Sequence, residues 1–175
     1  NPLTVSSSGD PRRNVIVWMD HRAMAEARRV NETQEDVLRY VGGSISPEME
    51  IPKLLWLKRH LPSTYRAAGH FFDLADYLSF RATGSTARSI CTVVCKWNYL
   101  AHDQRWSHSY FERVGLGDLV SDNYAKIGTE IVASGTPLGV GLTKSAAQDF
   151  GLLEGTPVAA SLIDAHAGGV GTIGG

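Results

Sequence analysis

Residues 157–169 read PVAASLIDAHAGG, an apolar run that ends abruptly in an acid and continues into a pair of glycines. The apolar part, up to Ile163, is typical of a strand buried inside a sheet. Because ligands of α/β proteins bind beyond the carboxyl ends of strands, Asp164 is predicted to face a binding crevice. A helix cap is the alternative role for this acid. Gly168 and Gly169 would form a poor first helical turn, so we expect instead a turn that a ligand approaches closely.

The same pattern occurs near the start of the chain. The apolar, β-branched run from Val15 to Met19 predicts a second buried strand, which delivers Asp20, His21 and Arg22 at its carboxyl end. For Asp20 considered alone, an N-cap of the following helix is the favoured interpretation. Together, the two strand ends are the candidate ligand-binding loops of the chain.

Helices and shorter extended segments alternate along the rest of the sequence. Helices are predicted at residues 23–29, 35–40, 53–58, 73–81, 107–114 and 144–150, and extended segments at residues 70–72 and 125–133. The residues predicted to cap or end these helices are Asn31 or Thr33, Thr143, Gly42, Gly84 and Gly151. This mixture of strands and helices, without an internal repeat, predicts the α/β class.

The composition is that of an ordinary soluble globular protein, with 43% hydrophobic and 20% charged residues over 175 positions. The formal net charge of −1 provides no basic surface for nucleic acid, and no apolar run reaches the length of a membrane span. The first residue is Asn1 rather than Met, and the last residues are apolar and rich in glycine. We therefore expect the chain to be one module of a longer protein.

Two cysteines, Cys91 and Cys95, are too few for a disulfide framework. Their spacing fits neither a zinc ribbon nor a redox motif. Four residues apart on a helix they would share one face, so the favoured interpretation is a pair of small buried thiols with a packing role. The sequence alone therefore assigns no metal site.

Four blocks of the sequence, in order and over nearly the whole chain, resemble segments of the FGGY family of carbohydrate kinases. These blocks are VWMDHRA at 17–23, GGSISPEMEIPKLLW at 42–56, DYLSFRATG at 76–84 and LIDAHAGG at 162–169. Within that family, the last block, the triplet DHR at 20–22 and the triplet CKW at 95–97 are most similar to the ribulokinase branch.

The resemblance implies a two-domain kinase on the RNase H-like fold of actin and hexokinase. Residues 1–13 would form a loop, and residues 14–175 the sugar-binding first domain, without the N-terminal phosphate hairpin and the C-terminal nucleotide domain. ATP and Mg²⁺ would be bound mainly by the second domain, so this chain alone is expected to be inactive. The resemblance also implies a cytoplasmic enzyme that acts on a small sugar, does not bind nucleic acid or membranes, and is compatible with a homodimer.

The resemblance further assigns roles to individual residues. Asp164 takes the position of the general base that serves a terminal hydroxyl of a ketopentose such as ribulose. Lys96 matches a lysine that contacts the sugar in ribulokinases. The other residues implied to bind the sugar are Asp20, His21, Arg22, Glu48 and Met49.

Two other functions fit some of the same residues. Asp20, His21, Asp164 and His166 are oxygen and nitrogen ligands at two predicted strand ends, which is also compatible with a metal-dependent hydrolase. A non-catalytic, sugar-binding fragment is the third hypothesis. The metal content of the purified protein distinguishes the hydrolase from a kinase. Sugar binding without ATPase activity would indicate the non-catalytic fragment.

Overall fold

The structure, a computed structural model, describes residues 1–173, so the predicted domain end at Gly175 lies outside the described residues. The chain divides into two compact units. Unit 1 comprises Asn1–Phe71 and Lys96–Lys126, and unit 2 comprises Phe72–Cys95 and the described chain from Ile127 onward. Each unit has its own buried residues and is described by itself below.

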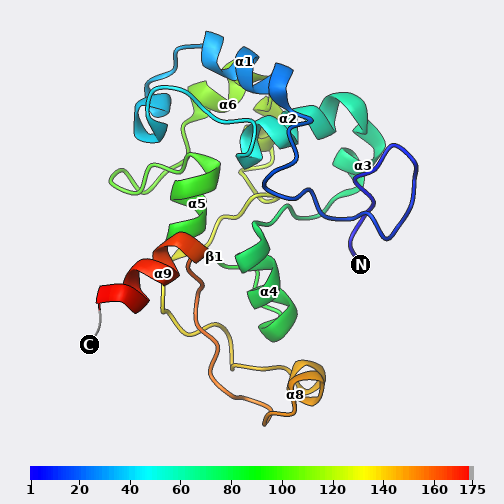
Figure 1. Cartoon of the computed structure of the whole chain (residues 1–175), viewed down its shortest axis with the longest axis vertical. Coiled ribbons are helices and arrows are strands. Elements are labelled where there is room, and N and C mark those ends of the chain that lie inside the picture. Colours follow the sequence, from blue (N-terminus) through cyan, green and yellow to red (C-terminus); the bar gives the residue numbers. More distant parts are fainter. Residues whose placement is uncertain (174–175) are drawn as a thin grey trace. The chain divides into compact units, whose positions relative to one another are not determined.

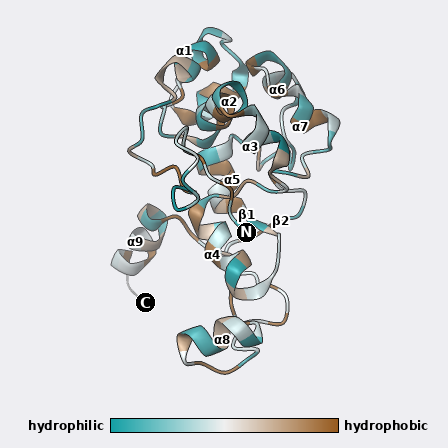
Figure 2. Ribbon diagram, turned by 90° about the vertical axis from the view of Figure 1, so that its right-hand side faces the viewer, coloured by the Kyte–Doolittle hydropathy of each residue, from teal (hydrophilic) through white to brown (hydrophobic). Residues whose placement is uncertain are grey.

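Unit 1 is built from helices (Figure 1). They are α1 (Met24–Glu32), the 3-10 helix η1 (Asp36–Val41), α2 (Glu50–His60), α3 (Pro62–Ala67), α6 (His108–Val114) and α7 (Gly117–Ser121). Helix α2 packs against α1 and α3, and α6 packs against α7. The helices α1, α2 and α6 carry both hydrophilic and hydrophobic residues (Figure 2), as expected for helices that each cover one side of a core. The hydrophobic residues with no exposed surface in this core are Ala23, Val30, Ile51, Tyr110, Phe111, Val114, Leu116 and Leu119.

Unit 2 combines helices with a small parallel sheet. Its elements are α4 (Leu74–Thr83), β1 (Arg88–Ser89), most of α5 (Ile90–Trp97), β2 (Ile131–Val132), α8 (Lys144–Phe150) and α9 (Asp164–Ile173). Strands β1 and β2 pair in parallel, with Arg88 opposite Ile131 and Ser89 opposite Val132. Helix α4 packs against α8 through Ala82, which forms a buried apolar cluster with α8.

Local signals in the sequence predict several helix boundaries correctly. Helix α4 begins after Asp73, whose carboxylate accepts the N–H of Ala75, and it ends at Gly84 with a left-handed φ of 78°. Helix α8 begins after Thr143, which accepts the N–H of Ala146, and it ends at Gly151 with a φ of 66°. A left-handed residue after the last turn is the common way to end a helix, and glycine adopts it at least cost.

The predicted cap of the second helix is wrong. Residues 36–41 form a 3-10 helix without a side-chain cap, although Gly42 ends it as predicted. The Asn31 side chain instead accepts the N–H of Ile45 at 2.7 Å and donates to the carbonyl of Ile45 at 3.1 Å. Thr33 donates to the carbonyl of Val30 at 2.6 Å. Both side chains are therefore used to fold the connecting loop, which the sequence pattern does not reveal.

The predicted strand at residues 15–19 is also wrong. No strand pairs with these residues anywhere in the described part of the chain, and Val15, Val17, Trp18 and Met19 are each between 51% and 63% exposed. An apolar, β-branched run becomes a strand only where a neighbouring strand satisfies its backbone groups. Here the carbonyls of Val17 and Trp18 bind a lysine side chain instead.

Two other predicted extended segments are mostly not strands in the structure. Residues 70–72 contain no strand, and the N–H of Phe71 makes one backbone hydrogen bond of 2.7 Å to the carbonyl of Lys126. Only Ile131–Val132 of the predicted segment 125–133 is a strand, because the residues up to 127 lie in turns.

The segment before Asp164 is extended but is not a continuous strand. It pairs antiparallel with residues 135–138, through one bridge between Pro137 and Ala159 and hydrogen bonds such as that from the N–H of Leu138 to the carbonyl of Val158 at 2.8 Å. Residues Asp164–Ile173 then form α9, so the prediction of a non-helical turn is wrong. The glycines at 168 and 169 each weaken a helix by about 1 kcal/mol, which does not prevent one from forming.

The start of α5 is fixed by a buried carboxylate. Asp76 of α4 is 2% exposed and accepts the N–H of Ser89 at 2.9 Å and the hydroxyl of Thr92 at 2.5 Å. Burial raises the pKa of Asp76 above its ordinary value, and these two hydrogen bonds oppose the rise. The side chain of Asp76 therefore joins α4 to the first turn of α5.

Buried Arg88 shapes the strand region of the same unit. Its guanidinium lies 3.7 Å from the ring centroid of Phe72, and burial lowers its pKa to about 10. Gly128 has a φ of 118°, and a Cβ at this position would lie 2.5 Å from Cγ of Arg88. Position 128 therefore requires glycine for both its backbone conformation and the close approach of the arginine stem.

Candidate functional site

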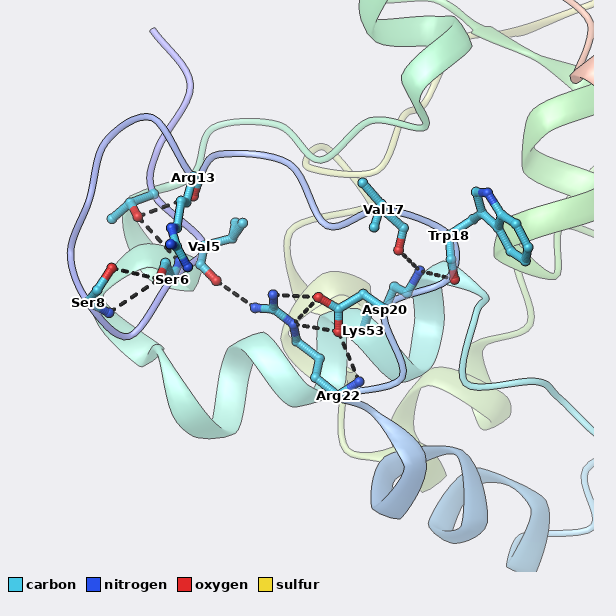
Figure 3. Close-up of polar contacts among 10 residues, drawn as sticks. Val5, Ser6, Ser8, Arg13, Val17, Trp18, Asp20, Arg22 and Lys53 are labelled. Carbon is cyan, nitrogen blue, oxygen red and sulfur yellow. Dashed lines mark hydrogen bonds and ion pairs between the residues drawn. The ribbon is translucent and has the colours of Figure 1, made fainter.

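Asp20 and Arg22 form a tight ion pair within unit 1 (Figure 3). Oδ1 of Asp20 accepts the backbone N–H and the Nε–H of Arg22, both at 3.0 Å, and Oδ2 accepts Nη2–H at 2.6 Å. Nη1 of Arg22 donates to the carbonyl of Val5 at 2.6 Å. The hydrogen bonds from Arg22 lower the pKa of Asp20, which keeps it ionised.

This pairing corrects the favoured interpretation of Asp20 as a helix cap. Helix α1 has Ala23 at its N-cap position and no side-chain cap, so Asp20 serves the turn before the helix rather than the helix itself. The guanidinium of Arg22 also lies 4.7 Å from the ring centroid of Trp56 on α2. Asp20 and Arg22 therefore hold residues 20–22 against α2.

Lys53 is a polar anchor that sequence reasoning missed. It projects from α2, is 7% exposed, and its Nζ donates to the carbonyls of Val17 at 2.8 Å and Trp18 at 3.2 Å (Figure 3). Burial lowers the pKa of Lys53, while the charges of Glu50, Asp20 and Glu48 act to raise it. The sequence could have indicated this role, because Lys53 stands among apolar helix residues in the block PKLLW, and a lysine buried there needs hydrogen-bond acceptors.

The structure places most of the predicted sugar-binding residues around this lysine. His21 and Glu48 form a contact of 3.2 Å between Nε2 and Oε1, and their side chains are 58% and 37% exposed. Met49 is buried at the residue before α2. Lys96, in the last turn of α5, is partly buried, and its charge contributes to the lowered pKa of Lys53. Unit 1 thus brings together charged groups from three parts of the sequence.

Asp164 lies in unit 2 and is exposed as the first residue of α9. The alternative metal centre would take Asp20 and His21 from unit 1 and Asp164 and His166 from unit 2. Among residues 1–173, the one group of three or more ligand side chains close enough for a metal contains His166 but none of the other three residues. The hydrolase hypothesis therefore has no support in the described chain.

The comparison with protein families settles the relationship. Residues 4–171 match the N-terminal domain of the FGGY family of carbohydrate kinases. The chain belongs to the FGGY family of carbohydrate kinases. The family predicted from the four sequence blocks is thereby confirmed.

Relatives in this family include kinases with named substrates. The chain is 57% identical over 175 residues to the human FGGY carbohydrate kinase domain-containing protein, covering 99% of this chain and 32% of the relative. It is 41% identical to a D-ribulokinase of Saccharomyces cerevisiae, covering 92% of this chain and 24% of the relative. A ribulokinase of Bacillus licheniformis is 32% identical, and the match covers 91% of this chain and 29% of the relative. The chain thus spans about a third or less of the length of these relatives.

Solved structures share the fold of this FGGY domain. A xylulose kinase from Lactobacillus acidophilus matches with a TM-score of 0.75 and 16% identity, over 98% of this chain and 34% of that chain. A glycerol kinase from Plasmodium falciparum, solved with ADP, matches with a TM-score of 0.74 and 15% identity, over 95% of this chain and 32% of that chain. The predicted fold class, the α/β fold of actin-like and hexokinase-like sugar kinases, is confirmed. Within residues 1–173, no helix has the length and apolar character needed to cross a bilayer.

Proposed function

We propose that the whole protein is an ATP-dependent carbohydrate kinase that phosphorylates a terminal hydroxyl of a ketopentose related to ribulose. The observation that carries this proposal is the group of charged side chains around Lys53, which lies in a domain of the FGGY family. The names of the D-ribulokinase and ribulokinase relatives support the choice of sugar. A cytoplasmic location and a homodimer stay predictions from the family resemblance.

The members of the group that are at least partly accessible to solvent suit a polyhydroxylated ligand. Glu48 can accept hydrogen bonds from sugar hydroxyls, Lys96 can only donate, and His21 can do either according to its tautomer. Arg22 and Asp20 satisfy each other, so we assign them to holding the turn that presents His21. In this proposal Lys53 and the pair of Asp20 and Arg22 position the site, and His21, Glu48 and Lys96 bind the sugar.

Asp164 is the proposed general base. It accepts the proton of the attacking hydroxyl as that oxygen forms a bond to the γ-phosphorus of ATP and the bond from phosphorus to the ADP oxygen breaks. The transition state of phosphoryl transfer is loose, so the proton leaves late and a weakly basic carboxylate suffices. The carboxylate also orients the hydroxyl oxygen toward phosphorus.

Bound Mg²⁺ would neutralise charge that develops on the phosphates. It prefers oxygen ligands in octahedral geometry, whereas the metal-capable group in the described chain consists of two thiols and an imidazole. That group is therefore not a magnesium site, and the family resemblance assigns Mg²⁺ mainly to the second domain, so the role proposed for Asp164 is that of a base.

A substrate panel tests the proposed function. The whole protein, assayed with ATP and ribulose, xylulose, gluconate or glycerol, should show the highest kcat/KM with ribulose, because two relatives that match over more than nine-tenths of this chain are named D-ribulokinase and ribulokinase. Xylulose is the matched control, since it differs from ribulose only in configuration at one carbon. A preference for glycerol or gluconate would refute the ketopentose assignment, and no sugar-dependent turnover would refute the kinase.

The variant Lys96→Ala tests sugar binding in unit 1. Loss of a charged hydrogen bond in a cleft costs about 1.5–3 kcal/mol, so we expect the KM for sugar to rise about 10- to 150-fold. The KM for ATP should change little. Lys144→Ala, which removes an exposed lysine from α8, is the matched control and should leave both constants unchanged. Equal increases in both Michaelis constants of the Lys96 variant would indicate a folding defect instead.

A further inference from the structure

Unit 2 contains a cluster of soft ligand atoms. Cys91 and Cys95 lie one turn apart on α5, and neither forms a disulfide. His166 approaches them from the first turn of α9. The two sulfurs and a ring nitrogen of the histidine all lie within 4.8 Å of one another, and Sγ of Cys91 lies 3.0 Å from Nδ1 of His166.

We propose that Cys91, Cys95 and His166 form a binding site for a thiophilic divalent metal ion of the zinc class. In a tetrahedral zinc site the ligand atoms are about 3.8 Å apart for two sulfurs and about 3.5 Å apart for sulfur and nitrogen, as follows from bond lengths of about 2.3 and 2.0 Å. The side chains therefore need only small rotations to bind. Two thiolates and an imidazole select zinc-like ions over magnesium, calcium or manganese.

The surroundings of the cluster support a metal with one open coordination position. Cys91 is 8% exposed, and its sulfur accepts the N–H of Ile163 at 3.4 Å, a hydrogen bond that also stabilises a metal-bound thiolate. Cys95 is partly buried and His166 is exposed. The ion would therefore reach the cluster from the His166 side, and the fourth position would be filled by water or a small ligand. On binding, each thiol releases its proton to solvent, so the affinity should rise with pH.

The metal would also connect two elements of unit 2. His166 lies two residues after Asp164, in the same first turn of α9, whereas both cysteines belong to α5. A bound ion would tie this turn to α5 and restrict the backbone that carries Asp164. We therefore expect zinc to inhibit phosphoryl transfer, a consequence that rests on the proposed function, whereas binding of the metal does not.

Cobalt titration of the whole protein under reducing conditions tests the site. Co²⁺ should produce a thiolate-to-cobalt charge-transfer band and the visible bands of a tetrahedral ion, and Zn²⁺ should abolish both by displacement. Because the whole protein can contain other thiols, the decisive quantity is the difference between wild type and Cys95→Ser. That difference should saturate at one equivalent of Co²⁺. Cys95 is only partly buried, so its serine variant suits this test, and a melting curve checks that it is folded.

Two histidine variants test whether His166 is a ligand of the metal. His166→Gln should weaken Co²⁺ binding at least about tenfold, because loss of an outer-shell partner already costs about 10- to 100-fold. His102→Gln, which removes an exposed histidine of unit 1, should leave the titration unchanged. The proposal is overturned if wild type gives no thiolate band, or if the band survives unchanged in folded Cys95→Ser. Co²⁺ binding without inhibition by zinc would overturn only the link to Asp164.

Discussion

Replacement of Asp164 by asparagine in the whole protein is expected to lower kcat by about 10²- to 10⁴-fold, the usual contribution of a general base. Asparagine keeps the shape of the side chain but cannot accept the proton of the attacking hydroxyl. The affinity for sugar should change far less, because the proposed sugar contacts lie in unit 1. The measurements are kcat, sugar affinity and melting temperature of the same preparation.

A structural role for Asp164 predicts a different result. As the first residue of α9, the carboxylate interacts favourably with the helix dipole, which contributes about 0.3–1 kcal/mol when exposed. Loss of this interaction in Asp164→Asn would lower the melting temperature slightly and leave kcat almost unchanged. Asp149→Asn, at an exposed aspartate of α8, is the matched control for a change of charge in the same unit. If kcat of Asp164→Asn stays within a few-fold of wild type, Asp164 is not the base.

The helix ends of this FGGY domain were predictable because their causes are local. Asp73 and Gly84 enclose α4, and Thr143 and Gly151 enclose α8, so each signal lies within a few residues of the boundary that it sets. The same local rules gave the wrong cap for η1, since Asn31 uses its amide on Ile45, fourteen positions away. Local chemistry offers several partners to a polar side chain, and tertiary structure selects one.

The strands and the polar anchors were less predictable because they depend on distant partners. Residues 15–19 have strand propensity, but the carbonyls of Val17 and Trp18 accept hydrogen bonds from Lys53, about 35 positions away, and not from another strand. The cysteine pair could be placed on one helix face from its spacing alone. The approach of His166, 75 positions beyond Cys91, could not, because only the fold of unit 2 brings it there.

Asp76→Ala is expected to have the largest effect on local stability. The substitution leaves the buried N–H of Ser89 without its acceptor and removes one partner of the Thr92 hydroxyl, at the first turn of α5. An unsatisfied buried donor costs about 1–3 kcal/mol, and the small cavity adds to this, so we expect a loss of about 2–4 kcal/mol. Hydrogen exchange measured on peptides that cover residues 88–97 reports this quantity directly, because it follows local opening of α5.

The size of the expected change separates the role of Asp76 from ordinary helix capping. A loss of 2–4 kcal/mol corresponds to amide protection about 30- to 700-fold lower in α5. Asp73→Ala is the matched control on the same helix, since it removes only the N-cap of α4 and should cost about 1 kcal/mol there while α5 stays protected. Asp76→Asn retains an acceptor for Ser89 and should fall between wild type and the alanine variant. Protection of α5 within about threefold of wild type in Asp76→Ala would mean that another group holds the helix that carries Cys91, Cys95 and Lys96.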